Sequence, residues 1–282
     1  MSEPALEPGR LVRAAPSVQR LLAPNPSLMT GPGTNTYLLG DPPTVVVDPG
    51  PDDPQHLALI AQAAPQLALI LVTHTHADHA AGAMALAART GARLVGRAAP
   101  GDGRQVSGFR PQHEPQRDER FELACGAVRA IDTPGHASNH VCYLLEREGL
   151  LFSGDHILDG VTPVIVPPDG SMAAYLDALR RLKGYALSAI APGHGRVLAE
   201  PRAVIDGIIA HRERREAKVV RALGEGAART LEELLREVYD DVRPELHGLA
   251  RLSLTAHLIK LEEEGCCRHE GDRWYRTTSK RS

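Results

Sequence analysis

Short apolar runs punctuated by glycine and proline open the chain. Between Val18 and Val47 the segments VQRLLA, TNTYLLG and TVVVD are typical of strands in an antiparallel sheet. The pattern then changes, because residues 54–64 and 80–89 are rich in alanine and leucine and predict helices. Each helix precedes an apolar strand candidate, LALILVTH or ARLVG, so strands and helices alternate from here on.

A second set of strands follows a long irregular segment. FELACGAVRAIDTPGH and VCYLLEREGLLFSGD predict hairpins, SMAAYLDALRRLK predicts a helix, and YALSAIAPGHG predicts a last strand. The repeated order of strands and helices predicts an α+β fold, in which a duplicated sheet-plus-helix unit forms a four-layer sandwich. Residues 96–119 show no period, and a loop of that length inside a domain is more often functional or mobile than neutral.

The character of the chain changes after residue 200. AVIDGIIAHRERREAKVVRAL predicts a long helix with a charged face, and Thr230 and Glu233 are spaced as a capping box. LARLSLTAHLIKLEEEG predicts an amphipathic helix, and CCRHEGDRWYR predicts a hairpin. Helices followed by a hairpin outline a winged-helix-like domain. We therefore predict two domains, residues 1–200 and residues 201–282.

The overall composition excludes few functions. The 282 residues are 43% hydrophobic and 24% charged, with a net charge of -3, which indicates a globular protein without a general affinity for nucleic acid or membranes. Aromatic residues make up 4%, with Trp274 the only tryptophan, so stacking surfaces for single strands are scarce. The N-terminal MSEPALEPGR is not a secretory signal, and no apolar run would span a membrane. We expect a cytoplasmic protein with no membrane partner.

Potential metal ligands stand at the ends of apolar runs. In ILVTHTHADH, His74 and His76 would leave one face of a strand, and Asp78 and His79 would occupy the first turn of the next helix. Three more potential ligands follow apolar runs and adjoin glycine, which lets the backbone turn sharply. One histidine is more often structural, but seven such residues in this order predict a metal centre. The seven are His74, His76, Asp78, His79, His136, Asp155 and His194.

This order, THTHADH, then GH, GD and GH, resembles the metallo-β-lactamase superfamily, with spacings similar to those of glyoxalase II. The resemblance covers about residues 18–200 and implies an αββα sandwich with its site between the edges of two sheets. It also implies the ligand assignment: His74, His76 and His136 for a first metal, Asp78, His79 and His194 for a second, and Asp155 as a bridge. Nitrogen and oxygen ligands suit two zinc ions, with manganese or iron as alternatives.

Such ligands imply a hydrolase in which a metal-bridging hydroxide attacks the substrate. We expect Asp78 and His140 to be the catalytic residues, with His140 either orienting a ligand or donating a proton to the leaving group. Asp48, in VVVDPG, either orients a ligand or simply forms a turn. His156 is expected to point away from the site.

The chain as a whole resembles the beta-lactamase-like protein 2 family. The matching segments are GPGTNTYLLG, TPGHASNH, LFSGDHIL, APGHGRVL, AHRERRE, RTLEELLREVYDD and LTAHLIKLEEEG. The family combines a metallo-β-lactamase body with a C-terminal winged-helix-like domain, and its animal member is a single-strand-selective endoribonuclease. Single-stranded RNA is therefore the leading substrate. A thioesterase or acyl-ester hydrolase of glyoxalase II type is the alternative, and β-lactam hydrolysis is a weaker one.

The charged residues after residue 200 allow different partners. Arg212, Arg214, Arg215 and Lys218 are candidate RNA contacts, but the interleaved Glu213 and Glu216 favour a solvated helix face. Leu252, Leu254, Leu258 and Leu261 are expected to line the core of the C-terminal domain. Since three glutamates oppose His257 and Lys260, we expect no specific duplex DNA binding. The C-terminal domain is at least as well explained as a protein-interaction or homodimerisation module. A degenerate, non-enzymatic body is a further alternative, and the intact ligand set argues against it.

Overall fold

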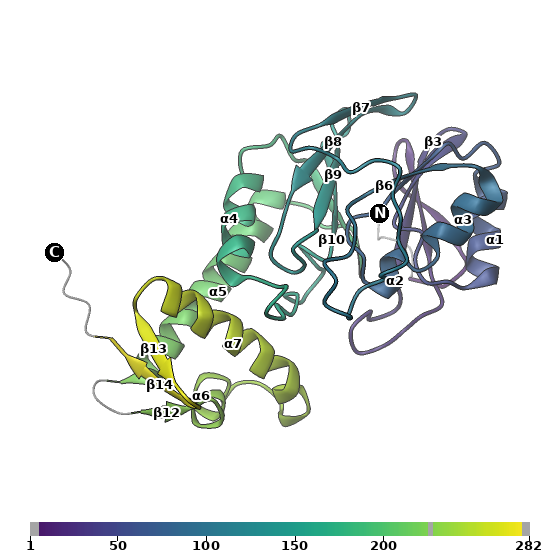
Figure 1. The fold of residues 1–282 in the computed structure, drawn as a ribbon. Coiled ribbons are helices and arrows are strands. Elements are labelled where there is room, and N and C mark those ends of the chain that lie inside the picture. The colour runs from purple at the N-terminus through teal and green to yellow at the C-terminus, as the bar shows by residue number, and fades with distance from the viewer. Residues whose placement is uncertain (1–5, 225–227, 278–282) are drawn as a thin grey trace.

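The computed structural model describes residues 6–224 and 228–277, so the first five residues of the acidic N-terminal segment lie outside it. Two sheets pack face to face, with helices on both outer faces (Figure 1). The strands of the first sheet, in spatial order, are β1 (Leu11–Ala15), β2 (Val18–Leu22), β3 (Asn35–Gly40), β4 (Pro43–Val47), β5 (Leu69–Leu71) and β6 (Arg93–Val95). The first four strands are antiparallel, and β4, β5 and β6 are parallel.

The second sheet has the order β11-β10-β9-β8-β7 and is antiparallel except between β10 and β11. Its strands are β7 (Arg120–Leu123), β8 (Gly126–Asp132), β9 (Val141–Leu145), β10 (Leu150–Gly154) and β11 (Ala189–Pro192). The helices of the body are α1 (Pro54–Ala63), α2 (Ala77–Ala80), α3 (Ala83–Thr90), α4 (Met172–Leu182) and α5 (Pro201–Leu223). The predicted four-layer α+β sandwich is confirmed, although β1 was not among the predicted strands.

Hydrophobic clusters hold the four layers together. One cluster lies between the sheets and includes Val47, Tyr143 and Phe152. A second joins the first sheet to α1 and α3, and a third joins the second sheet to α4 and α5. Strands such as β3, β9 and β10 are buried on both faces, which explains why their sequences do not alternate between apolar and polar residues.

The long segment 96–119 is anchored to the body. Phe109 is fully buried in the cluster under α1 and α3. The Val106 amide donates to the Thr75 carbonyl at 2.8 Å, and the side chain of Gln105 donates to Asp169 at 2.8 Å. The segment therefore supports the backbone around residue 75, which carries several of the candidate ligands.

The C-terminal domain follows α5 and is drawn beside the body in Figure 1. It contains α6 (Leu231–Val238), the 3-10 helix η1 (Pro244–Leu246), α7 (His247–Glu263) and a sheet of β12 (Arg229–Thr230), β14 (Arg273–Arg276) and β13 (Cys267–Glu270). The capping box at Thr230 and Glu233 is present. Leu254, Leu258 and Leu261 are in the domain core, whereas Leu252 is half-buried, so the winged-helix outline is confirmed and one of the four core positions differs.

Two of the basic residues expected on the surface of the long helix are buried. Arg212 is 3% exposed and Arg215 is 8% exposed, because α5 lies between the body and the C-terminal domain. The expectation of a solvated helix face is therefore wrong for this pair, whereas the expectation of RNA contact stays a prediction. Lys218 is paired with Asp240 at 2.7 Å, and Arg214 remains exposed. Among the residues that the structure describes, no helix has the length and apolar content needed to cross a membrane.

The anchoring of segment 96–119 leads to a stability prediction. Phe109→Ala removes a fully buried ring and should lower the free energy of unfolding by about 3 to 5 kcal/mol. Arg110→Ala, the exposed neighbour, is the control and should change it by less than about 0.5 kcal/mol. Urea unfolding followed by circular dichroism measures both, and equal stability of the two variants would show that the segment is not part of the core.

Candidate metal centre

The seven candidate ligands come from the ends of strands in both sheets. His74 and His76 follow β5, and Asp78 and His79 lie in α2. The remaining three follow strands of the second sheet, since His136 comes after β8, Asp155 directly after β10, and His194 after β11. Because β5 ends at Leu71, strand alternation does not explain the pairing of His74 and His76, and that part of the prediction is wrong. They lie instead in the irregular segment between β5 and α2.

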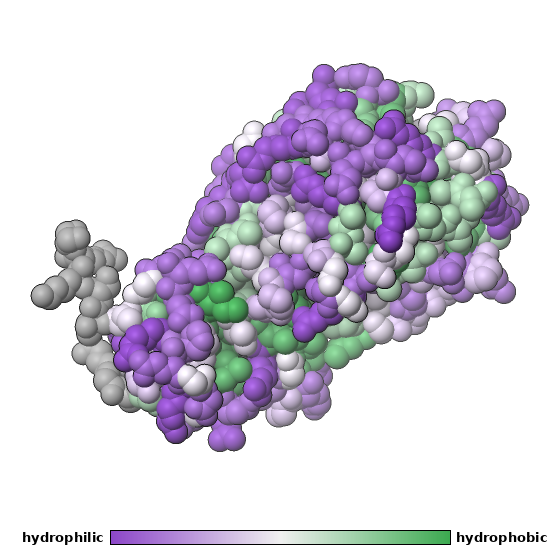
Figure 2. Space-filling model, in the orientation of Figure 1, coloured by the Kyte–Doolittle hydropathy of each residue, from purple (hydrophilic) through white to green (hydrophobic). Residues whose placement is uncertain are grey.

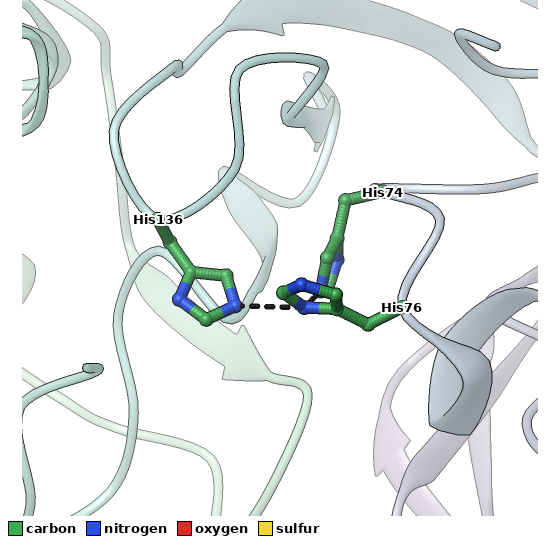
Figure 3. A group of neighbouring side chains, drawn as sticks. All are labelled: His74, His76 and His136. Carbon is green, nitrogen blue, oxygen red and sulfur yellow. Dashed lines mark hydrogen bonds between the residues drawn. The ribbon is translucent and has the colours of Figure 1, made fainter. Parts of the chain in front are cut away.

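Three imidazoles form the first group (Figure 3). His76 Nδ1 lies 2.9 Å from His74 Nε2 and 3.0 Å from His136 Nε2. The three nitrogens thus face one small volume, although His136 belongs to the other sheet. Three neutral imidazole nitrogens that converge in this way suit one divalent cation.

Two carboxylates and two imidazoles form the second group, Asp78, His79, Asp155 and His194. His194 Nε2 lies 3.2 Å from Asp78 Oδ2 and 3.3 Å from Asp155 Oδ1. The other oxygen of Asp155, Oδ2, lies 3.8 Å from His136 Nε2 in the first group. Asp155 therefore stands between the two groups, where a bridging carboxylate would stand.

Several atoms of the second group are buried without a hydrogen-bond partner. They are His79 Nε2, Asp155 Oδ1 and His194 Nε2. An unpaired buried carboxylate oxygen is costly unless a cation compensates it. The donor set therefore fits a metal ion, and its nitrogen and oxygen atoms suit zinc, iron or manganese.

In His136 and His194, a hydrogen bond from Nδ1 leaves Nε2 as the nitrogen that can bind a metal. His136 Nδ1 donates to the Val164 carbonyl at 2.9 Å, and His194 Nδ1 donates to the Gly33 carbonyl at 3.1 Å. Since a carbonyl oxygen only accepts, Nδ1 carries a proton in both rings, and Nε2 is the nitrogen that would bind a metal. The sequence did not identify these backbone partners, because neither carries a side-chain motif.

Asp48 orients the His79 ring in the same way, by accepting a hydrogen bond from its Nδ1 atom. Its Oδ2 atom accepts from His79 Nδ1 at 2.8 Å and from Thr73 Oγ1 at 2.7 Å. The residue is 2% exposed and has a left-handed φ of 50°, which is unfavourable for aspartate outside a constrained site. Of the two interpretations of Asp48, the geometry therefore supports the one that orients a ligand.

The pKa directions agree with this division into two groups. Burial, and then the neighbouring His79, lowers the pKa of His74 well below its ordinary value, and burial lowers the pKa of His76 to about 4. Both rings are therefore neutral and able to bind a metal. Burial alone would lower the pKa of His194, but Asp155 outweighs it and raises that pKa to about 9. The second group thus attracts positive charge.

His140 and His156 lie behind the ligands. His140 is fully buried, its ring stacks on that of His74 at 5.0 Å, and its Nδ1 atom lies 2.8 Å from Thr133 Oγ1. This position supports the His74 ring and offers no surface to a substrate. His156 is also fully buried and packs against Tyr175 at 4.8 Å, away from the two ligand groups.

A cavity of about 760 Å³ adjoins the site at His136 and Asp155. Its walls come from residues 158–164, from α5 and from the C-terminal domain, and most of the wall side chains are apolar. Figure 2 shows hydrophobic surface where the C-terminal domain meets the body. The sequence did not reveal this cavity, because its walls are far apart along the chain.

Two parts of the chain match known families. Residues 29–194 match the family described as the metallo-beta-lactamase superfamily. Residues 230–274 match the family described as the beta-lactamase associated winged helix domain. The candidate ligands all lie within the first match.

Individual proteins show the same likeness over most of the chain. This chain is 33% identical over 273 residues to the beta-lactamase-like protein 2 homolog of Drosophila melanogaster. The alignment covers 90% of this chain and 91% of that protein. It is 32% identical over 207 residues to the thioesterase pkgB of Emericella nidulans, covering 72% of this chain and 57% of that protein. A solved beta-lactamase domain protein from Burkholderia ambifaria superposes with a TM-score of 0.81 at 21% identity, covering 98% of this chain and 95% of that one, and so shows the same fold.

Gly193 allows a direct test of the second group. A Cβ atom at this position would lie 2.6 Å from Asp155 Oδ1 and 2.6 Å from His79 Cε1, closer than the neighbouring ligands tolerate. Gly193→Ala should therefore lower the metal content per chain to about half that of the wild type, measured by elemental analysis of purified protein. Gly108→Ala, which meets nothing within 4 Å, is the control and should keep the wild-type metal content. Full metal content in Gly193→Ala would contradict this ligand assignment.

Proposed function

The chain belongs to the metallo-beta-lactamase superfamily, a family of hydrolases, and from this premise we propose that it hydrolyses acyl thioesters or related acyl esters at a centre of two zinc ions. The observation that carries the proposal is the apolar cavity beside His136 and Asp155. A mostly apolar cavity next to a hydrolytic centre suits a substrate with an acyl chain.

Exposed apolar side chains extend this wall toward solvent. Leu28, Met29 and Val161 are 71%, 52% and 63% exposed, and all three line the cavity. Large apolar side chains of this exposure are unfavourable in water, so their gathering at one cavity marks a binding surface for an apolar group. The name of the thioesterase from Emericella nidulans agrees with such a substrate.

Single-stranded RNA is the second candidate, carried by the resemblance of the whole chain to the beta-lactamase-like protein 2 family. An RNA site would need several basic contacts to phosphates and aromatic rings for stacking. Of the residues that line the cavity, Tyr239 is the only aromatic one besides the histidines, and α5 buries two of the four proposed basic contacts. The shortage of aromatic rings among these lining residues is the reason for placing the acyl substrate before RNA.

The C-terminal domain is not proposed to read duplex DNA. His257 is fully buried and lies 3.2 Å from Glu216, and the Lys260 amine lies 2.8 Å from the same carboxylate. These two basic groups of helix α7 are therefore held against α5 and are not presented to a groove.

Different residues of the chain would have different roles in hydrolysis. His74, His76 and His136 would hold one ion, Asp78, His79 and His194 the other, and Asp155 would contact both. When bound, the two ions would supply an activated water and polarise the scissile carbonyl. Asp48 keeps the His79 ring in place, and the cavity wall positions the acyl chain so that its carbonyl lies at His136 and Asp155.

Proton transfer involves Asp78 rather than His140. The Asp78 side chain is 26% exposed, so its second oxygen is open to accept a proton from the attacking water. A thiolate leaves without prior protonation because its pKa is only about 8.5. The buried His140 is therefore not needed as a proton donor, and it supports His74 instead.

A side-by-side assay tests the proposed function. Metal-loaded protein receives hexanoyl-coenzyme A, S-lactoylglutathione, single-stranded RNA and a β-lactam. We expect turnover of the thioesters, and Asp78→Asn should reduce kcat/KM more than about 100-fold, since loss of even an outer-shell partner costs 10- to 100-fold. Asp177→Asn, an exposed residue of α4, is the control and should keep wild-type activity.

Chelation completes this test. Activity should disappear when a chelator removes the metal, and re-addition of zinc, manganese or iron singly should identify which ion restores it. Cleavage of RNA without turnover of any thioester would refute the acyl substrate and support the endoribonuclease.

A further inference from the structure

The cavity that adjoins the metal centre is electrically asymmetric. Of the residues that line it, Asp155 is the only one with a carboxylate, and it belongs to the metal end. Four basic residues line the parts of the wall formed by α5 and the C-terminal domain: His211, Arg212, Arg215 and Arg243. An apolar acyl chain does not require positive charge there.

Two guanidinium groups one turn apart on α5 differ in their partners. Arg215 donates to the Asp241 carboxylate at 2.7 Å, so its charge is compensated. Arg212 is only 3% exposed. Its guanidinium donates to the Pro163 carbonyl and lies over the Tyr175 ring, whose centroid is 5.5 Å away. Within residues 6–224 and 228–277, no carboxylate forms an ion pair with Arg212. A buried charge without a counter-charge is costly.

Three buried polar atoms in this wall have no hydrogen-bond partner. They are His211 Nδ1, Arg212 Nε and Tyr239 Oη. Tyr239 is 6% exposed, so its hydroxyl is not satisfied by bulk water. Water inside the cavity would satisfy a hydroxyl or an imidazole, but it would not neutralise a buried guanidinium. The group that completes this wall must therefore be a negatively charged acceptor.

We propose that Arg212, together with Tyr239 and His211, forms an anion subsite in the cavity, which binds a carboxylate or phosphate group that the substrate carries away from its scissile bond. The guanidinium provides the charge, and the hydroxyl provides a second donor from the C-terminal domain. Burial, and then the nearby Arg212, lowers the pKa of His211, which agrees with a positive potential at this wall.

The subsite gives the C-terminal domain a role in substrate selection. Arg215 contacts the Tyr239 ring at 4.3 Å and donates to the Val238 carbonyl, so α5 fixes the end of α6 against the cavity. The metal centre and the anion subsite then bind a substrate at two separate points. This inference rests on the proposed function only for the identity of the bond that is hydrolysed.

Binding of simple anions tests the subsite without any turnover. Isothermal titration of metal-loaded protein with glutarate and with inorganic phosphate should show that Arg212→Gln weakens binding of at least one of them about tenfold or more. Arg221→Gln, an exposed guanidinium on the same helix, is the matched control and should bind as the wild type does. Equal binding by Arg212→Gln and the wild type would overturn the subsite.

A second variant keeps the test valid if Arg212→Gln does not fold. Tyr239→Phe removes only the unpartnered hydroxyl and should weaken binding of the same anion several-fold, with an unchanged circular dichroism spectrum. Unchanged binding in Tyr239→Phe would overturn the part of the proposal that assigns this hydroxyl.

Paired thioesters distinguish the two sources of the anion. Glutaryl and the isosteric 5-methylhexanoyl group are each offered on coenzyme A and on N-acetylcysteamine. A loss of kcat/KM in Arg212→Gln confined to glutaryl substrates places the carboxylate of the acyl chain in the subsite. A loss confined to coenzyme A substrates places the carrier phosphates there, and an equal change for all four substrates would overturn the subsite.

The two experiments also separate this inference from the proposed function. If no thioester is hydrolysed but Arg212→Gln still loses anion binding, the proposed function fails and the subsite stands. If thioesters are hydrolysed and neither anion binding nor substrate preference depends on Arg212, the proposed function stands and the subsite fails.

Discussion

The buried negative charge of Asp155 constrains the rest of the structure. Asp155 is 8% exposed, and it lies among imidazoles whose Nε2 atoms have no other partner. Such a group is stable only if several ligands converge on a cation, and no single element can provide them all. The two sheets must therefore meet at this edge, and each sheet contributes ligands from the ends of its strands.

Much of the surrounding structure keeps these ligands in place. Asp48 adopts a left-handed backbone and accepts from both His79 and Thr73, and segment 96–119 binds the backbone at Thr75. Backbone carbonyls at Gly33 and Val164 set the rings of His194 and His136. These contacts come from outside the ligand motifs, and they define which nitrogen of each ring faces the metal.

The two ends of the cavity, at the metal centre and at the wall formed by α5, differ in the sign of their charge. At the metal end the side chain of Asp155 is negatively charged, whereas at the wall formed by α5 the side chain of Arg212 is positively charged. Between them the walls are apolar, so a substrate with a reactive carbonyl and a distant negative charge matches both ends. In the proposed subsite, the C-terminal domain contributes the hydroxyl of Tyr239.

The sequence by itself determined the fold class, the winged-helix outline and the seven candidate ligands, because apolar periodicity, capping and histidine spacing are local or ordered along the chain. It did not determine why His74 and His76 converge, since β5 ends before them and both lie in the irregular segment that precedes α2. It also misplaced Arg212 and Arg215, because a charged helix between two domains has the same pattern as a solvated one. Only the tertiary structure decided the partners of each imidazole, the shape of the cavity and its unpaired charge, since these depend on contacts between residues that are distant in the chain.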